Sequence, residues 1–433
     1  MIDLIKKCLL AMPVIADWSI VHSLKSREEL YLIFNETEAL RSVEEESYNI
    51  TIYINSEDDG RKQTGRGTVA FNRTITETDL MTQLEAAVFS AGLALNPFYT
   101  ISDREDNTLK YEQCDPQIAA DTRAVIKNLQ SRLQAKFAAN PDVRCASAEI
   151  FVTKRQSRLL TSRGVEHQID STSVMLEAVI LTGEGEKEVE SNLNRSETFL
   201  SVLDIDNLLD RYIGYARENI HARLPLSGRY PVIFTEEALD TFFEYHTAQV
   251  SGGMLYNRMN KFSVGETMVK DAAGDKLTLS FDPVLPGGEQ TGKYDGYGTL
   301  REKFTAIEDN IFKKIVADKK YADYLKCPAT GSAGNVVVHT GSRTFEQLLE
   351  DGCFILSRFS AFAPRSSTGA FSGEIRNGLF YKNGTFQPVK GGSVTGKMDE
   401  AFQNVYFSSE TCQRGAYYGP RYIKIGELDI AGD

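Results

Sequence analysis

The chain has 433 residues, of which 42% are hydrophobic and 25% are charged, as in ordinary soluble globular proteins. This length favours two domains with separate cores, and the formal net charge of −12 argues against a broad phosphate-binding surface, and so against direct nucleic-acid binding. No run of about 18 uncharged apolar residues occurs, so the sequence predicts no membrane-spanning helix.

The N-terminal half begins with a short helix followed by extended segments. Residues 1–8 (MIDLIKKC) carry charge throughout, as an amphipathic helix does, and lack the apolar run of a signal peptide. Apolar and polar side chains alternate along residues 48–54 (YNITIYI), which is typical of a half-buried strand. Further strands are predicted at 29–34 and 65–72.

Helices follow, separated by more strands. From Thr78 to about residue 96 the apolar residues recur with a helical period. A second helix has Asp115 as its N-cap and Pro116 at its first position, and its apolar stripe runs to Phe137. The other predicted elements of this half are strands at about 147–153 and 172–182 and a helix at about 204–222. This mixture predicts an N-terminal domain of the α/β or α+β class.

A segment that contains proline and glycine, residues 224–231 (LPLSGRYP), is the predicted boundary between an N-terminal α/β domain at 1–224 and a C-terminal domain at 225–433. We expect a strand at 232–234 and a helix from Thr235 to about Val250 beyond it. The rest is rich in glycine and in short β-like segments, which predicts a β-rich, barrel- or sandwich-like domain and an α+β protein overall. Brief helices are expected near 318–325, 344–351 and 397–405.

The six cysteines are scattered and form no CxxC pair. In a chain of this length such usage indicates reduced thiols, and it predicts a cytoplasmic protein rather than a disulfide-stapled one. Cys353 lies in an apolar, strand-like run and is predicted to be buried. Cys412 lies in a polar loop, where a partly exposed thiolate could act as a nucleophile, although no base is visible beside it.

The five histidines form no HExxH motif, and no nucleophile elbow, P-loop or Rossmann glycine pattern occurs in its required context. His246 falls on an apolar helix face with Leu239, Phe242, Phe243 and Val250. One interpretation is a core histidine with a hydrogen-bond partner, and the other is a leftover metal ligand. A catalytic zinc needs about three protein ligands, whereas the local sequence supplies one.

Several short motifs in the C-terminal half occur in a particular order. They are 262–266 (FSVGE), 281–283 (FDP), 295–301 (DGYGTLR), 335–341 (NVVVHTG), 369–378 (GAFSGEIRNG), 388–396 (PVKGGSVTG) and 422–432 (YIKIGELDIAG). Together they resemble the TldD/PmbA family, and the chain is identified as a PmbA/TldE-type member. Glu374 and Asn377 are not adjacent, as they are in the family pattern, and Val394 replaces its isoleucine. The motifs span about 225–433, and 1–224 matches the family only in layout.

The resemblance implies a two-subunit metalloprotease. In this family the TldD-type subunit carries HExxxH and a C-terminal cysteine that hold zinc, while the PmbA/TldE-type subunit lacks the motif and helps to enclose the peptide. Counting back from 264–266 places the motif's window on 241–246 (TFFEYH), with Thr241 at the first histidine and Phe242 at the general-base glutamate. His246 remains, and Cys412 lies near the family's cysteine ligand. These two residues are vestigial metal-ligand candidates, and the sequence supports no confident catalytic or metal site.

Three functions follow as hypotheses. The leading one is a non-zinc subunit that pairs with a TldD-like zinc subunit and encloses unfolded peptides for proteolysis, with no cofactor of its own and zinc on the partner. The second is a non-proteolytic regulatory protein, in line with the family's older label, modulator of DNA gyrase. The third is a thiol peptidase that uses Cys412. A homodimer is expected when the partner is absent, because a surface built for a homologous subunit can pair with itself.

Overall fold

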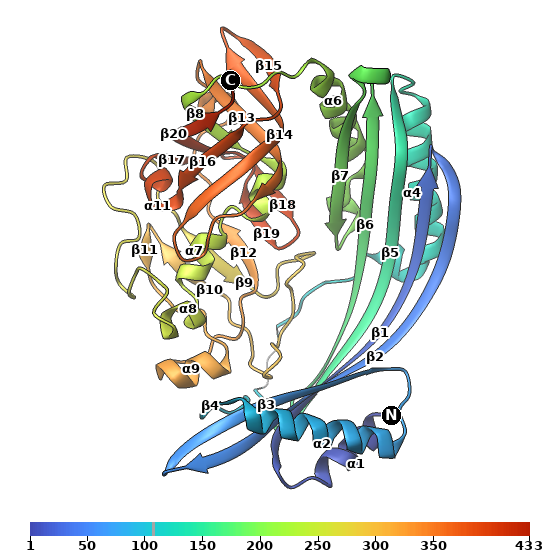
Figure 1. Cartoon of the computed structure of the whole chain (residues 1–433), viewed down its shortest axis with the longest axis vertical. Coiled ribbons are helices and arrows are strands. Elements are labelled where there is room, and N and C mark those ends of the chain that lie inside the picture. The colour runs from blue at the N-terminus through green and yellow to red at the C-terminus, as the bar shows by residue number, and fades with distance from the viewer. Residues whose placement is uncertain (106–108) are drawn as a thin grey trace.

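The computed structural model describes residues 1–105 and 109–433 and consists of a tall, curved sheet beside a β-rich body (Figure 1). Within these residues no helix has both the length and the apolar character needed to cross a membrane. Helices and strands are mixed, and strands dominate the C-terminal half, which confirms the predicted α+β class with its β-rich C-terminal part.

The first sheet has seven strands in the order β4-β3-β2-β1-β5-β6-β7, and every pairing in it is antiparallel. Its strands are longer than predicted, because hairpin partners extend the ladder through charged stretches with little apolar pattern. β7 pairs with β6 on one side and is the edge of this sheet. The strands are β1 (Ile15–Ile33), β2 (Glu36–Asp58), β3 (Arg61–Asn72), β4 (Leu95–Pro97), β5 (Val143–Thr161), β6 (Glu166–Thr182) and β7 (Val189–Glu197).

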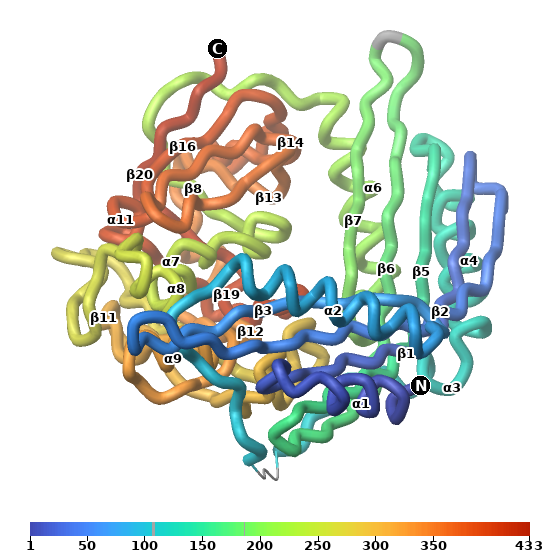
Figure 2. The backbone as a smooth tube through the Cα atoms, turned by 60° about the horizontal axis from the view of Figure 1, so that its bottom comes forward, coloured from blue at the N-terminus to red at the C-terminus, as the bar shows by residue number. Residues whose placement is uncertain are grey.

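Helices cover one face of this sheet in two groups. α4 and α6 pack on strands β1, β5 and β6 through one apolar core, and α1 and α2 pack on β1 to β3 through another. Figure 2 shows α2 lying along β3. The helices of this half are α1 (Ile2–Leu10), α2 (Glu77–Leu93), α3 (Pro116–Ala120), α4 (Thr122–Ala138), the 3-10 turn η1 (Gly185–Lys187), α5 (Leu200–Leu203) and α6 (Ile205–His221).

The long helix predicted from Asp115 is two helices. Asp115 does cap the first, but Asp121 leaves the helical conformation, with φ −157° and ψ 94°, and caps α4. The Asp121 side chain accepts from the amides of Arg123 and Ala124. An aspartate competes for backbone amides in this way, so it favours a new helix start over continuation.

A closed barrel forms the centre of the C-terminal half. Its strands run in the order β13-β8-β20-β16-β14, and β14 pairs back with β13. Apolar side chains from its interior join one large core with the neighbouring sheet. The strands concerned are β8 (Gly228–Phe234), β13 (Cys353–Phe362), β14 (Ala370–Lys382), β15 (Thr385–Val389), β16 (Ser393–Lys397), β17 (Val405–Phe407) and β20 (Ile423–Ala431).

A third sheet, in the order β11-β10-β9-β12-β19-β18, packs against the barrel. Its strands are β9 (Leu279–Asp282), β10 (Phe304–Glu308), β11 (Ile311–Phe312), β12 (Asn335–Val338), β18 (Thr411–Arg414) and β19 (Tyr417–Pro420). The short helices of this half are η2 (Glu236–Asp240), α7 (Glu244–Gln249), α8 (Gly252–Tyr256), α9 (Lys319–Leu325), α10 (Phe345–Leu348), α11 (Met398–Ala401) and η3 (Phe402–Asn404).

The prediction of one continuous helix from Thr235 to Val250 is wrong. The segment forms a 3-10 turn, η2, then breaks at Thr241 with φ −121°, and resumes as α7. Thr241 Oγ1 donates to the carbonyl of Phe362 at 2.5 Å, and both Phe242 and Phe243 are buried. Adjacent aromatic side chains that must both enter a core do not suit a one-sided helix, so tertiary packing overrides the local pattern.

Candidate functional site

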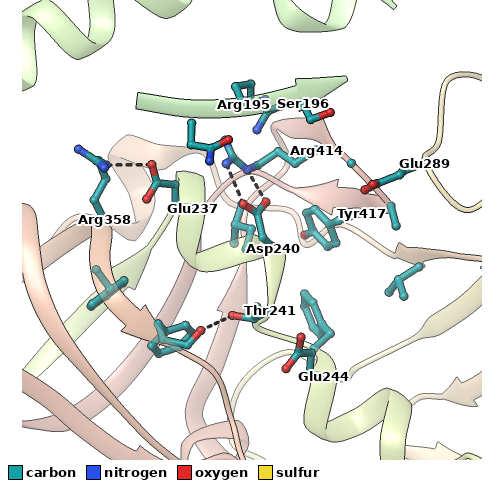
Figure 3. A pocket seen from close by; sticks show the side chains of 18 of the residues that line it. Arg195, Ser196, Glu237, Asp240, Thr241, Glu244, Glu289, Arg358, Arg414 and Tyr417 are labelled. Atoms are coloured by element: carbon teal, nitrogen blue, oxygen red, sulfur yellow. Dashed lines mark hydrogen bonds and ion pairs between the residues drawn. The ribbon is translucent and has the colours of Figure 1, made fainter. Parts of the chain in front are cut away.

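A cavity of about 580 Å³ lies where the edge strand β7 faces the C-terminal half (Figure 3). One wall is formed by residues 194–197 of β7, and the other by residues 358–362 of β13. η2, the start of α7, the β18–β19 hairpin, Glu289 and Val336 complete the lining. The site therefore draws on segments from both halves of the chain.

Two strand edges border this cavity. β7 has β6 on one side and no strand on the other within the described residues. β13 pairs with β8 only at Phe354, Ile355 and Leu356, so its stretch at 359–362 has no strand partner on that side among the described residues. At such edges backbone amides and carbonyls can pair with an extended chain, and of those at 359–362 the Phe362 carbonyl already accepts from Thr241 Oγ1.

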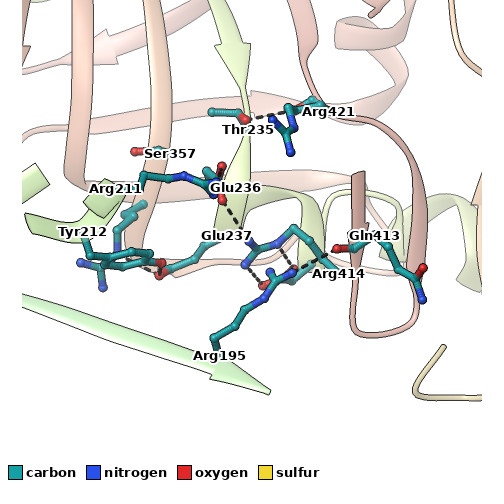
Figure 4. Close-up of polar contacts among 12 residues, drawn as sticks. Arg195, Arg211, Tyr212, Thr235, Glu236, Glu237, Ser357, Gln413, Arg414 and Arg421 are labelled. Atoms are coloured by element: carbon teal, nitrogen blue, oxygen red, sulfur yellow. Dashed lines mark hydrogen bonds and ion pairs between the residues drawn. The ribbon is translucent and has the colours of Figure 1, made fainter. Parts of the chain in front are cut away.

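Arg414 organises the charged groups at the cavity's base (Figure 4). Its side chain is 6% exposed, and its guanidinium donates to both carboxylate oxygens of Asp240 at 2.7 and 3.0 Å. It also donates to Glu236 at 3.1 Å, and Glu236 in turn accepts from Arg211 at 2.6 Å. Such paired, hydrogen-bonded charges fix the geometry of η2 because breaking one pair would leave a buried charge alone.

A second pair ties η2 to the barrel. Arg358 Nε donates to Glu237 at 2.8 Å, and the Tyr212 hydroxyl donates to the same carboxylate oxygen at 2.7 Å. The Arg358 guanidinium lies 5.1 Å from the centre of the Tyr212 ring. Helix α6, strand β13 and η2 are thus held together beside the cavity.

Glu197 at the end of β7 is the most buried acid of the cavity. Its side chain is fully shielded from solvent, one carboxylate oxygen contacts the Arg195 guanidinium, and the other has no hydrogen-bond partner within the described residues. Burial raises the pKa of Glu197 to about 7, although the charges of Arg195 and Arg414 oppose that rise. A carboxyl group of this kind changes charge near neutral pH.

His246, one of the two vestigial candidates, does not line the cavity. It is 2% exposed, its ring centre lies 4.1 Å from that of Phe402, and Nδ1 has no hydrogen-bond partner among the described residues. Burial lowers the pKa of His246 to about 3. Thr241, at the position of the family's first histidine, does line the cavity, while Phe242 lies in the core.

Cys412, the other candidate, lines a different cavity of about 350 Å³ beside Arg211, Arg414 and Arg421. Its thiol is free, and burial raises its pKa to about 11, so the thiolate is scarce at neutral pH. No histidine lines this cavity. Among the described residues, the lining of this cavity therefore offers Cys412 no imidazole of the kind that activates a catalytic thiol.

The residues at the family's zinc positions do not fit a zinc ion. Among the described side chains of residues 1–105, 109–185 and 187–433, no group of three or more His, Cys, Asp or Glu is placed to hold a metal. Thr241 and Phe242 offer neither a ligand nor a base, and His246 is surrounded by aromatic rings. No reaction step is therefore assigned to a metal on this chain.

Sequence reasoning missed most of the residues that build the cavity. The polar strand β7 was not predicted, and the network of Arg195, Arg211, Arg358 and Arg414 with η2 joins segments far apart in the sequence. The available signal was the acidic run at 236–240 (EEALD) directly after a buried strand, because several acids there need cationic partners.

Comparisons with known proteins identify the C-terminal part. Residues 227–432 match the model of the PmbA/TldA metallopeptidase C-terminal domain. The chain is 22% identical over 287 residues to an uncharacterized protein of Methanocaldococcus jannaschii, which covers 63% of this chain and 66% of that protein, just under two thirds. It is also 22% identical over 332 residues to a zinc metalloprotease TldD homolog of Saccharolobus solfataricus, which covers 68% of this chain and 72% of that protein.

Three solved structures share the fold over the whole chain. TldE from Thermococcus kodakarensis has a TM-score of 0.79 at 18% identity, with all of both chains covered. A proposed modulator of DNA gyrase from Bacteroides thetaiotaomicron has a TM-score of 0.83 at 18% identity and covers 100% of this chain and 98% of that one. A similarly named protein from Thermotoga maritima has a TM-score of 0.80 at 14% identity, with both chains covered completely.

Proposed function

Because the chain belongs to the TldD/PmbA family through its C-terminal domain, we propose that it is a TldE-like, non-zinc subunit of a metalloprotease. In this proposal it pairs in the cytoplasm with a TldD-like subunit that carries the zinc, and it helps to enclose unfolded peptides for cleavage. It has no cofactor and contacts neither nucleic acid nor a membrane.

The cavity between the β7 and β13 edges is the observation that carries the proposal. A peptide that adds as a strand to such an edge is held by backbone hydrogen bonds, which do not depend on its sequence. This mode suits unfolded substrates, whose backbone groups are not yet paired. The ion pairs of η2 keep the facing wall fixed while the peptide binds.

In this proposal the hydrolytic step belongs to the partner, which is supported by the lack of the HExxxH motif at 241–246 of this chain. A zinc ion there would need ligands and a base to activate water, and Thr241 and Phe242 supply neither. The contribution of this chain is to bind and orient the peptide and to exclude water around it.

The test is reconstitution. The purified chain, free of affinity-tag histidines, is assayed with an unfolded peptide mixture alone, with a TldD-like chain, and with that chain after its first motif histidine is replaced by alanine. We expect cleavage only with the intact partner. Chelator-sensitive cleavage by this chain alone would refute the proposal.

The regulatory alternative rests on the names of two of the structural neighbours, proteins proposed to modulate DNA gyrase. With its net charge of −12 the chain would act in that role through protein contacts rather than through DNA. Affinity purification with and without a TldD-like chain separates the two roles. Recovery of the TldD-like chain supports the protease subunit, and recovery of gyrase in its absence supports the regulator.

A further inference from the structure

The charges that line the cavity do not balance. Its basic residues are Arg195, Arg358 and Arg414, and each has an acidic partner in Glu197, Glu237 or Asp240. Two further acids of the lining, Glu244 and Glu289, have no ion pair within the described part of the chain. The cavity therefore carries an excess of negative charge.

Glu244 and Glu289 come from separate elements. Glu244 begins α7, and Glu289 lies in the loop after β9, with its carboxylate close to the backbone of Gly415. In Figure 3 neither has a dashed contact, whereas Glu237 and Asp240 do, and the Tyr417 ring lies between them in that view. Both residues are exposed, so their carboxylates are accessible to a ligand.

Glu197 is an independent sign that the cavity accepts a ligand group. Its carboxylate is completely shielded from solvent; one oxygen contacts the Arg195 guanidinium, and the other has no hydrogen-bond partner among the described residues. Buried carboxylate oxygens normally accept hydrogen bonds, so the oxygen of Glu197 that does not contact Arg195 is a place where a donor from outside would be stabilised.

The apolar part of the lining fits the stem of a long basic side chain. Phe243, Phe359, Phe362 and Tyr417 contribute to it. The methylene groups of lysine or arginine pack well on such surfaces while the charged end stays with acids, and aromatic faces attract cations.

We infer that this cavity receives a cationic group of the bound peptide, a basic side chain or the amino terminus, held by Glu244 and Glu289. This inference rests on the proposed peptide-binding function and adds a charge preference to it. Backbone pairing at the strand edges would set the direction of the peptide, and the acids would set its register.

The test measures peptide binding to the full-length chain alone, because this chain forms the whole lining. The probes are fluorescein-labelled decapeptides of glycine, serine and valine with lysine, arginine, glutamine or glutamate at the centre and both termini blocked. A further glutamine peptide with a free amino terminus separates a side-chain preference from an amino-terminal one. Dissociation constants are measured by fluorescence anisotropy.

We expect at least one cationic peptide to bind about tenfold more tightly than the blocked glutamine peptide, since two solvent-facing ion pairs each add a modest factor. The double variant Glu244→Gln/Glu289→Gln should abolish that preference. A matched control, Glu36→Gln/Glu38→Gln, makes the same change of charge at exposed positions outside the cavity and should keep it.

Equal affinity for all peptides, tighter binding of the glutamate peptide, or a preference that survives the double variant would each overturn the inference. These outcomes leave the proposed function intact, because partner-dependent cleavage is measured separately. If no peptide binds the chain alone, the inference fails too, and reconstitution still decides the function.

Discussion

At the residue scale, His246 shows how burial alone can make a side chain sensitive to acid. Its ring is packed against Phe402, Phe243 and Tyr245, and the charge of Asp399 favours its protonated form. Asp399 is already engaged by the Tyr245 hydroxyl and by Lys261. Protonation of His246 in the folded protein is therefore strongly disfavoured.

This gives a prediction for stability against pH. The folded-state pKa of His246 is lowered from 6.5 to about 3, so the unfolded chain binds the extra proton first. The stability that neutral His246 contributes is complete above pH 6.5 and is lost as pH falls toward 3, at about 1.4 kcal/mol per pH unit. Measured by urea denaturation, the free energy of unfolding of His246→Leu relative to that of the wild type should rise by about 2 kcal/mol between pH 7.5 and pH 5.

His221 provides the matched control. It is exposed at the end of α6, and its replacement leaves the buried ring of His246 in place. The free energy of unfolding of His221→Leu should therefore change with pH as that of the wild type does. If the free energy of unfolding of His246→Leu also changed with pH as that of the wild type does, the buried neutral state assigned to His246 would be wrong.

The sequence placed His246 on an apolar face with Leu239, Phe242, Phe243 and Val250, and the structure buries all five side chains. The pattern could not show that Thr241 and His246 face different surroundings, the cavity and the aromatic core. That separation depends on the break after η2, which is made by packing contacts with Phe362 from a distant strand.

At the element scale, two glycines allow α2 to lie directly on β3. A Cβ at Gly65 would lie 2.1 Å from the carbonyl oxygen of Ala91, and one at Gly67 would lie 2.3 Å from that of Ala87. Backbone atoms cannot move aside as a side chain can, so the helix would have to lift off the sheet.

The substitution Gly67→Ala should therefore lower the free energy of unfolding by about 1–3 kcal/mol, measured by urea denaturation. The control is Gly214→Ala in the middle of α6, where an added Cβ has no atom within 4 Å. There alanine should raise stability by about 0.5–1 kcal/mol through helix propensity. Equal effects at the two positions would mean that the contact between α2 and β3 is looser than described.

Helices and strands with a clear apolar period of their own could be predicted from the sequence. Those whose position depends on pairing with another element could not. The helices predicted from Thr78 to about 96 and at about 204–222 form as α2 and α6, and each buries an apolar face that includes Leu80 and Leu84 or Leu209 and Ile213. β7 was missed because an edge strand has little apolar content, and Leu193 is its one buried aliphatic residue. Its position comes from the β6–β7 hairpin rather than from its own composition.

At the scale of the whole molecule, a cluster of tyrosines joins the two halves. Tyr53 and Tyr99 come from the N-terminal half, and Tyr297 and Tyr324 come from the C-terminal half. Tyr99 is 2% exposed, and its ring centre lies 5.9–6.2 Å from those of the other three. The other apolar cores each draw their residues from one half alone.

Tyr99→Ala should consequently uncouple the halves as well as destabilise the protein by about 3–5 kcal/mol. The single tryptophan, Trp18, lies in β1 and reports the N-terminal half by fluorescence, while calorimetry reports the whole chain. We expect the two melting curves to coincide in the wild type and to separate in Tyr99→Ala. The control is Tyr256→Ala, which removes contacts to Tyr321 and Tyr324 within one half, and coincident curves in both variants would contradict this role.

The candidate site could not be predicted from the sequence, because it depends on how the two halves of the molecule are placed. The cavity exists because β7 from one half faces β13, η2 and the β18–β19 hairpin from the other. No local pattern encodes the docking of two halves, and Arg195 and Arg414 acquire a shared role only after it. The division at 224/225 itself stays a prediction.

The order in which the barrel strands occur along the chain has a consequence for biosynthesis. β8, the first barrel strand to be made, lies between β13 and β20, and β20 is the last to be made. Every strand of the N-terminal sheet precedes β8, so that sheet can form while the ribosome is still translating the barrel. The barrel cannot close until β20 has been synthesised, so its strands keep unpaired edges that can associate with other chains until then. A nascent chain at that stage is a natural client for chaperones, and a ribosome that stalls before β20 would release an aggregation-prone product.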